Sequence, residues 1–127
     1  MLILKYVIPA VPPSNNKYIG RAAQWEYREV KKQWETLVRA VCKPLPEKPI
    51  EKATVTLCYF FPDRRRRDPD NYSGKMILDG LVKAGVLVDD SFGNIELKLK
   101  AEVDKDRPRV EIIILEKDKN HGKKNKA

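Results

Sequence analysis

This 127-residue chain has no long hydrophobic run, only two cysteines and a single histidine. No apolar run approaches the roughly 18 residues that a membrane span needs, so we expect no membrane segment. The chain starts on an apolar, β-branched segment and not on a basic leader, so we expect no signal peptide. Cys42 and Cys58 fit no zinc or CxxC spacing, and the one histidine, His121, lies in a lysine-rich tail. These absences favour a cytoplasmic protein with reduced thiols and no thiol or imidazole metal site.

The charge balance is strongly positive. Lysine plus arginine number 26 and aspartate plus glutamate 18, which gives a formal net charge of +8. A basic chain favours a polyanionic partner, although charge alone does not identify one. Residues 117–127 hold five lysines, one aspartate and no apolar residue larger than alanine, so we expect a disordered tail there. A hydrophobic content of 42% suffices for a single domain, which we assign to residues 1–116.

Hydrophobic periodicity predicts four strands and two helices. Strands are expected where β-branched and apolar residues dominate or alternate with charged ones, at Leu2–Pro9, Ala53–Phe61, Ile95–Val103 and Arg109–Glu116. Apolar residues three and four apart predict helices over Arg21–Cys42 and Tyr72–Ala84, the second ending at Gly85. Strict alternation in the third strand predicts one wet face, which is typical of antiparallel pairing. The order β-α-β-α-β-β indicates a mixed α/β fold, with two helices packed on one mixed sheet.

The segment between the second strand and the second helix is the most informative one. It runs from Asp63 through four consecutive arginines to Asn71. Pro69 favours an extended backbone at Asp68, and in an extended chain Asp68 and Asp70 project to one side, roughly 6.5–7 Å apart at Cα. Two close carboxylates repel each other unless a cation lies between them. A hard divalent ion such as Mg²⁺ suits oxygen ligands that share a phosphate.

Two carboxylates are few for a catalytic metal site, so we expect a third ligand from elsewhere. Asp89 and Asp90 are the best candidates, in the turn that follows the second helix. The sequence does not decide which end of the sheet that turn reaches. Lys75 lies in the first turn of the second helix, where a cation opposes the helix dipole and a role facing a ligand is favoured. Beside a metal-bound phosphate, its ammonium group would stabilise the pentavalent state.

Each of these patterns also has a simpler interpretation. A run of four arginines is commonly a solvated loop or a plain phosphate-binding patch. The Asp-Pro-Asp sequence is often a turn, with Asp70 or Asn71 capping the next helix. The later aspartate pair would then be a polar turn, and Lys75 and Asp79, four residues apart, would form a surface ion pair.

Two segments carry motifs that occur together in a known family. One lies within Val7–Tyr18 and reads Pro12-Pro13-Ser14-Asn15-Asn16-Lys17-Tyr18; the other lies within Phe60–Asp90 and joins the arginine run and Asp68-Pro69-Asp70-Asn71 to Leu78-Asp79-Gly80-Leu81-Val82-Lys83-Ala84-Gly85 and Asp89-Asp90. In this order they resemble the RusA family of Holliday junction resolvases. The first helix and the last two strands match only in order and length. The resemblance implies a mixed α/β fold, a bacterial or phage-encoded homodimer, and Mg²⁺ or Mn²⁺ as cofactor.

The resemblance also implies an activity and a set of residues. The activity is the cutting of four-way DNA junctions by paired symmetric nicks, through metal-assisted phosphodiester hydrolysis, in recombination and repair. Transferred motif by motif, the essential aspartates are Asp68, Asp70 and Asp90, and the essential lysine is Lys75. The residues expected to contact DNA are Arg66, Arg67, Asn15, Asn16 and Lys17. The competing hypotheses are a basic DNA-binding protein without catalysis and a nuclease that acts on flaps or RNA.

Overall fold

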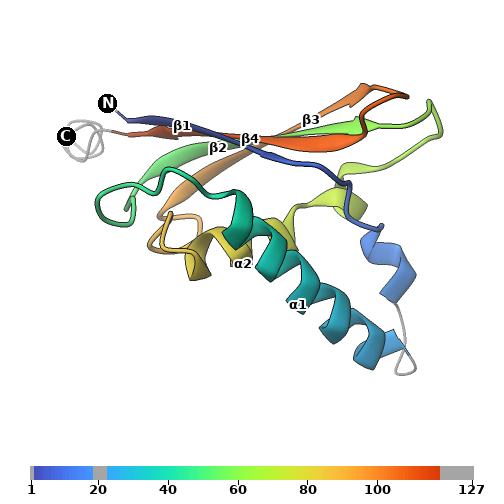
Figure 1. Ribbon diagram of the computed structural model, residues 1–127, viewed down its shortest axis with the longest axis horizontal. Coiled ribbons are helices and arrows are strands. Elements are labelled where there is room, and N and C mark those ends of the chain that lie inside the picture. Colours follow the sequence, from blue (N-terminus) through green and yellow to red (C-terminus); the bar gives the residue numbers. More distant parts are fainter. Residues whose placement is uncertain (1, 19–22, 118–127) are drawn as a thin grey trace.

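The computed structural model describes residues 2–18 and 23–117, and both helices lie on one side of a single sheet (Figure 1). The elements in chain order are β1 (Ile3–Ile8), a 3-10 helix η1 (Asn15–Tyr18), α1 (Gln24–Val41), β2 (Ala53–Phe61), a 3-10 helix η3 (Pro69–Tyr72), α2 (Lys75–Lys83), β3 (Ile95–Val103) and β4 (Arg109–Glu116). The mixed α/β class and the order β-α-β-α-β-β are confirmed. Residues 118–127 of the predicted tail lie outside the described residues.

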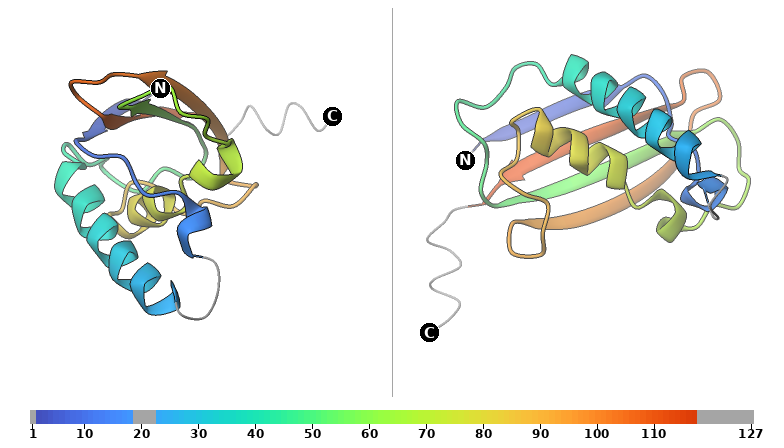
Figure 2. Two further views of the ribbon diagram at one scale, coloured as in Figure 1. Left: turned by 90° about the vertical axis from the view of Figure 1, so that its right-hand side faces the viewer. Right: turned by 90° about the horizontal axis from the view of Figure 1, so that it is seen from below.

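The strands are not arranged in chain order. β4 lies between β1 and β2 and is antiparallel to both, while β3 is parallel to β2, so the order across the sheet is β1-β4-β2-β3. Parallel neighbours cannot be joined by a hairpin and need a crossover connection. The connection from β2 to β3 contains α2, which lies under the sheet beside α1 (Figure 2).

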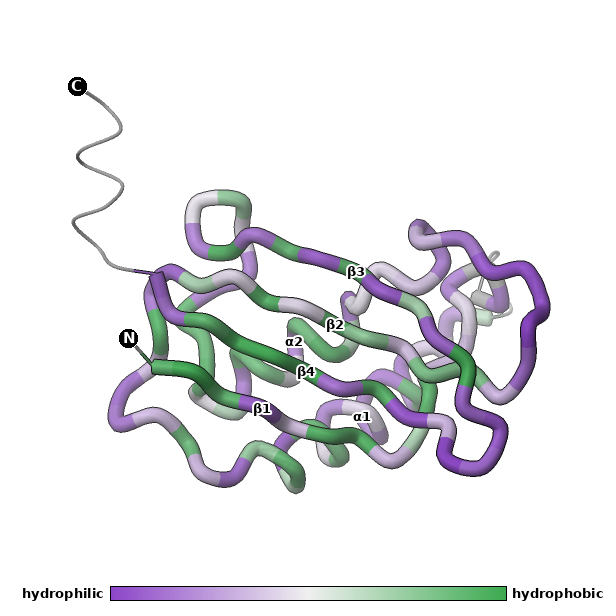
Figure 3. The backbone as a smooth tube through the Cα atoms, turned by 90° about the horizontal axis from the view of Figure 1, so that it is seen from above, coloured by the Kyte–Doolittle hydropathy of each residue, from purple (hydrophilic) through white to green (hydrophobic). Residues whose placement is uncertain are grey.

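β3 is an edge strand, and the antiparallel pairing predicted for it is wrong. It pairs with β2 in parallel along its whole length, with Val103 opposite Phe61. Alternation in a sequence marks a drier face, but it carries no information about the direction of the neighbouring strand. The apolar face of β3 is also poorly covered. Leu97 is 36% and Val103 46% exposed, whereas Phe61, which lies opposite Val103 on β2, is 5% exposed. Figure 3 shows β3 as an outer strand of the sheet, with polar and apolar residues alternating along it.

The core lies between the sheet and the helices. Alternate residues of β2 and β4, such as Leu57 and Ile112, are fully buried. From the helices, Val38 and Ile77 are equally buried and Trp34 is 7% exposed. Each such side chain contributes about 1.5–3 kcal/mol by leaving water. This burial fixes the ends of β2 and α2, between which the candidate functional residues lie.

The two helices approach closely at Gly80. An added Cβ at this position would lie 2.8 Å from the Cβ of Val38 on α1. Two ion pairs flank the contact: Lys31 Nζ lies 3.2 Å from Asp79, and Lys83 Nζ lies 3.1 Å from Glu35. Asp79 therefore pairs across the helices with Lys31, and the pair with Lys75 that the sequence offered is not the one observed.

Glycine divides the segment predicted as one helix over Tyr72–Ala84. Gly74 has φ +83°, a left-handed conformation, and it separates η3 from α2. A Cβ at Gly74 would also collide with the side chain of Leu57, so this position excludes larger residues on two grounds. At the other end Gly85 has φ +87°, and the predicted stop of the helix is confirmed.

We expect Gly80→Ala to destabilise the protein although alanine is the better helix former. Overpacking against Val38 costs about 1–3 kcal/mol, which outweighs the propensity gain of about 1 kcal/mol. The free energy of unfolding, measured by urea denaturation, should fall by about 1 kcal/mol. Gly93→Ala is the control, because a Cβ there meets nothing closer than 4.0 Å. A Gly80→Ala protein more stable than the wild type would contradict the close helix contact.

Candidate functional site

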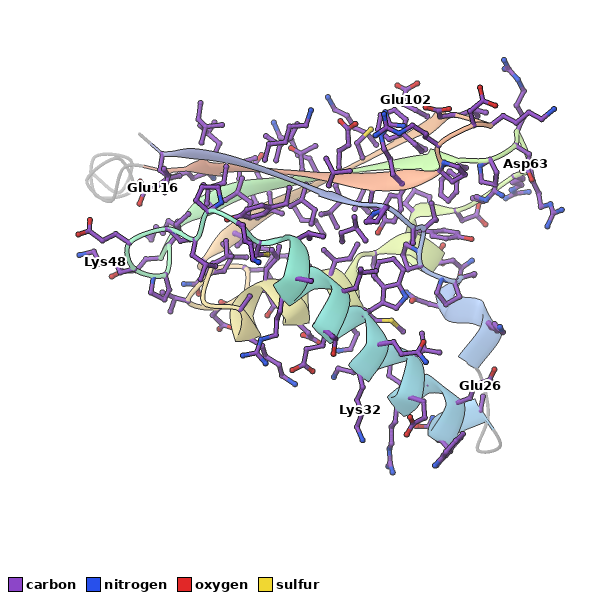
Figure 4. All side chains as sticks on the ribbon, in the orientation of Figure 1. Glu26, Lys32, Lys48, Asp63, Glu102 and Glu116 are labelled. Carbon is purple, nitrogen blue, oxygen red and sulfur yellow. The ribbon has the colours of Figure 1, made fainter. Side chains whose placement is uncertain are left out.

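Several segments far apart in the sequence meet at the end of the sheet where β2 stops. They are the loop 62–68, η3, the start of α2 and the loop that leads into η1. In Figure 4 the labelled Asp63 and Glu102 lie toward this end of the molecule, and Glu116 and Lys48 lie at the other. We call the part formed by Asn15 and residues 63–75 the acidic–basic corner, since it holds most of the predicted site residues.

The backbone around Pro69 agrees with the sequence analysis only up to Asp68. Asp68 is extended, with φ −101° and ψ 141°, as the following proline favours. From Pro69 the chain turns into η3, closed by the Asn71 amide donating to the Asp68 carbonyl at 3.0 Å. The argument that Asp68 and Asp70 converge in an extended chain is therefore wrong from Pro69 onward. The two carboxylates still lie within one turn of backbone at the surface.

The alternative that these residues are helix caps finds no support. Asp68 precedes η3, but its side chain makes no capping hydrogen bond. The residue that precedes α2 is Gly74, so neither Asp70 nor Asn71 caps that helix. Among the described residues, the carboxylate of Asp70 has no hydrogen bond or ion pair, and that of Asp68 accepts only from Arg66. Both carboxylates are thus available to a ligand.

Arg67 stabilises the loop that carries the arginines. Its guanidinium lies 2.9 Å from the Asp63 carboxylate, donates to the Asp63 and Arg65 carbonyls at 3.1 Å, and stacks 4.3 Å above the ring of Phe61. The Arg65 amide and then Arg67 hold the pKa of Asp63 below its usual value of 3.8. With 15% of its side chain exposed, Arg67 acts chiefly as a structural residue in this arrangement.

Arg66 points the other way. Its side chain is 87% exposed, and its Nε donates to Asp68 Oδ1 at 3.2 Å. An exposed pair of this kind contributes little to stability and is easily exchanged. Arg66 can therefore exchange Asp68 for another anion at little cost in stability. Arg64 and Arg65 are exposed as well.

The loop near the N-terminus is tied to the same corner by Asn15. Its side-chain amide donates to the Asp70 carbonyl at 3.3 Å and to Ser73 Oγ at 3.2 Å. Lys75, the first residue of α2, is exposed beside this loop. Lys17 is also exposed, while the side chain of Asn16 lies outside the described part of the structure.

Asp90 does not join the other aspartates within the chain. The Asp90 amide donates to the Asp89 carboxylate at 2.9 Å, in a connection where Leu87 bridges to Ile50. This connection enters β3 at the start of β2, and nine paired residues, or about 26 Å of strand, separate it from the end of β2 where Asp68 follows. Accordingly, the described residues contain no group of three or more acidic, cysteine or histidine side chains that could hold a metal ion.

Tyr59 borders the acidic–basic corner and was not singled out by the sequence. It is 2% exposed, and its hydroxyl has no hydrogen-bond partner among the described residues. Burial, and then the neighbouring Tyr72, raise the pKa of this hydroxyl well above its usual value, so it stays protonated and can donate. Its place in an alternating strand predicts an ordinary core residue. Only the structure shows that its hydroxyl has no partner among the described residues.

The fold and the corner together define a small mixed α/β domain that presents carboxylates, arginines and a lysine at one end of its sheet. The chain belongs to the endodeoxyribonuclease RusA family, whose model matches residues 9–115. Members of this family are Holliday junction resolvases, bind branched DNA and occur in bacteria and phages. No curated protein is similar enough to the chain to count as a match. None of the helices in the described ranges has the length and apolar character to cross a membrane.

The contrast between the two arginines can be tested by unfolding. We expect Arg67→Ala to lower the melting temperature by a few degrees, because it removes the ion pair, two carbonyl bonds and the stacking on Phe61. The matched variant Arg66→Ala should melt close to the wild type, since the only partner of Arg66 among the described residues is the half-exposed carboxylate of Asp68.

The pH dependence gives a second arm to this test. Because the folded pKa of Asp63 is lowered, its stabilisation is complete above the usual value of 3.8 and is lost as the pH falls through the folded pKa. The difference in melting temperature between the wild type and Arg67→Ala should become smaller as the pH falls through the folded pKa of Asp63. Equal melting of both variants at neutral pH would contradict a structural role for Arg67.

Proposed function

We propose that the protein is a divalent-metal-dependent endonuclease that resolves four-way DNA junctions by paired symmetric nicks. The observation that supports this most is the acidic–basic corner, in which Asp68, Asp70 and Lys75 gather at the surface of a chain of this nuclease family. The activity would serve DNA recombination and repair in the cytoplasm of a bacterium or a phage-infected cell.

The donors of the corner fit a hard divalent cation. Asp68 and Asp70 offer carboxylate oxygens, the ligands that Mg²⁺ and Mn²⁺ prefer. When bound, such an ion would activate water and stabilise charge on the phosphate being cut. Lys75 stabilises the negative charge of the pentavalent phosphorus from the start of α2. Arg66 exchanges its bond with Asp68 for a backbone phosphate and holds the strand in place.

A second copy of the chain completes the ligand set. Two aspartates at one end of β3 and a third at the other cannot meet in one protomer. A two-fold axis through the free edge of β3 would make two β3 strands antiparallel, and the start of each would lie beside the end of the other. Asp90 of each copy would then approach Asp68 and Asp70 of the other, and a junction of near two-fold symmetry would meet two such sites.

The surface of β3 supports this arrangement. Its edge presents unpaired backbone groups, which pair readily with another strand. Phe92, two residues after Asp90, is fully exposed. At the other end of the strand, an apolar pocket of about 70 Å³ lies beside Asp68 and is lined by Tyr72, Leu99 and Ala101 among others. The two-fold arrangement brings this aromatic side chain toward that pocket.

Two further groups of residues would raise the affinity for DNA without adding sequence preference. Asn15 and Lys17 border the corner on the side of the N-terminal loop and would line the path of the DNA. The lysines of residues 117–127 would bind phosphates by releasing counterions, and this contribution should weaken as the salt concentration rises.

The direct test is cleavage of an end-labelled four-way junction in the presence of Mg²⁺. We expect symmetric nicks from the wild type and, for Asp70→Asn, a loss of at least about a hundredfold, since even outer-shell partners of metal sites are worth 10–100-fold. Binding of the junction should be unchanged or tighter, because a negative charge that faces phosphate is removed. Asp106→Asn, in an exposed turn, is the control and should cut like the wild type.

The alternatives predict other outcomes of the same assay. A DNA-binding protein without catalysis would bind the junction and leave every strand intact in both proteins. A nuclease for flaps or RNA would cut those substrates in preference to the junction. Either result would overturn the proposal.

A further inference from the structure

A small recess opens at the N-terminus of α2. The residues that line it include Asn15, Tyr59 and the first three residues of α2, and no acidic residue is among them. Its volume is about 10 Å³, which is the space of a single water-sized oxygen atom. Asn15, one of the lining residues, donates to the Asp70 carbonyl, which ties the recess to the acidic–basic corner.

The first turn of α2 offers unused backbone donors. Its first internal hydrogen bond runs from the Leu78 amide to the Gly74 carbonyl, and no side chain caps the helix. Within residues 2–18 and 23–117, the amides of Lys75, Met76 and Ile77 find no acceptor. The turn also lacks an acidic residue. Amides without an acceptor and the positive end of a helix dipole favour an anion at such a place.

Tyr59 adds a side-chain hydrogen-bond donor to the recess. Its hydroxyl lies 3.4 Å from the position that a Cβ of Gly74 would occupy, directly under the start of the helix. It is 98% buried and unpartnered among the described residues, and burying a hydroxyl without a hydrogen bond is unfavourable. Tyr59 lines the recess together with Gly74 and the first residues of α2, so an oxygen that enters the recess would lie near both the hydroxyl and the amides.

We propose that this recess binds one oxygen of a DNA backbone phosphate. Tyr59 Oη donates to that oxygen, the amides of the first turn of α2 donate beside it, and Lys75 neutralises the phosphate from the rim. Tyr59 is thus a further binding residue, which positions the strand next to Asp68 and Asp70. The inference rests on the proposed function, since it assigns a phosphate subsite to the same corner.

The test uses inorganic phosphate and the full-length protein without DNA. In amide NMR spectra, phosphate should shift the signals of Lys75, Met76 and Ile77, while chloride at equal ionic strength should not. Tyr59→Phe should weaken this binding about tenfold, the effect of one hydrogen bond to a charged group. It should leave thermal stability unchanged or raised, because it removes a buried hydroxyl that has no partner.

Tyr6→Phe is the matched control. Tyr6 is equally buried, but its hydroxyl donates to the Pro44 carbonyl at 2.7 Å, away from the recess. This variant should lose stability and keep its phosphate affinity, which is the opposite of the result expected for Tyr59→Phe. A purely structural Tyr59 would behave like Tyr6.

The outcomes separate this inference from the proposed function. If phosphate leaves the three amide signals unchanged, or if Tyr59→Phe binds it as tightly as the wild type, the subsite is wrong even when junctions are cut. If phosphate binds as expected and no junction is cut, the subsite stands and the proposed nuclease activity fails.

Discussion

The parallel pairing of β3 with β2 decides where the candidate aspartates lie. Because parallel neighbours need a crossover, the chain leaves β2 at one end of the sheet and enters β3 at the other, with α2 between. Asp68 and Asp70 follow the end of β2, and Asp89 and Asp90 precede the start of β3 at the opposite end of the sheet. The same pairing leaves β3 at the edge, beyond the cover of the helices, with Leu97 and Val103 partly exposed. The separated carboxylates and the open edge therefore have one cause.

The acidic–basic corner, at the end of β2, combines residues that hold its loops in place with carboxylates that are available to a ligand. Arg67 holds the loop through Asp63 and Phe61, and Asn15 fastens the N-terminal loop to Asp70 and Ser73. Against this frame the Asp70 carboxylate is unpaired within the described ranges, and Asp68 is held only by an exposed arginine. A framework made rigid by some charged groups while others remain available is what a site for a metal ion and a phosphate requires.

Local rules predicted the elements and the mixed sheet correctly, and the pairing of the third strand wrongly. The helix stop at Gly85 and the extended Asp68 before Pro69 follow from single residues, and the structure has both. The direction of β3 depends on which strand lies beside it, a tertiary fact that alternation does not encode. Gly74 looked like part of a helix because apolar spacing continues across it, yet its left-handed φ of +83° separates η3 from α2. Tyr59 was missed for a similar reason. The alternation of a strand predicts that a side chain is buried, but not whether its hydroxyl finds a hydrogen-bond partner.

The claim that two copies share each site can be tested by mixing two inactive variants. Asp70→Asn and Asp90→Asn should each fail to cut a junction. In a mixed dimer, one site would carry both substitutions and the other neither, so nicking of one strand per junction should return when the variants are dissociated and reassociated together. If each chain used its own Asp90, no mixed dimer would contain an intact site, and a mixture as inactive as either variant alone would contradict the account.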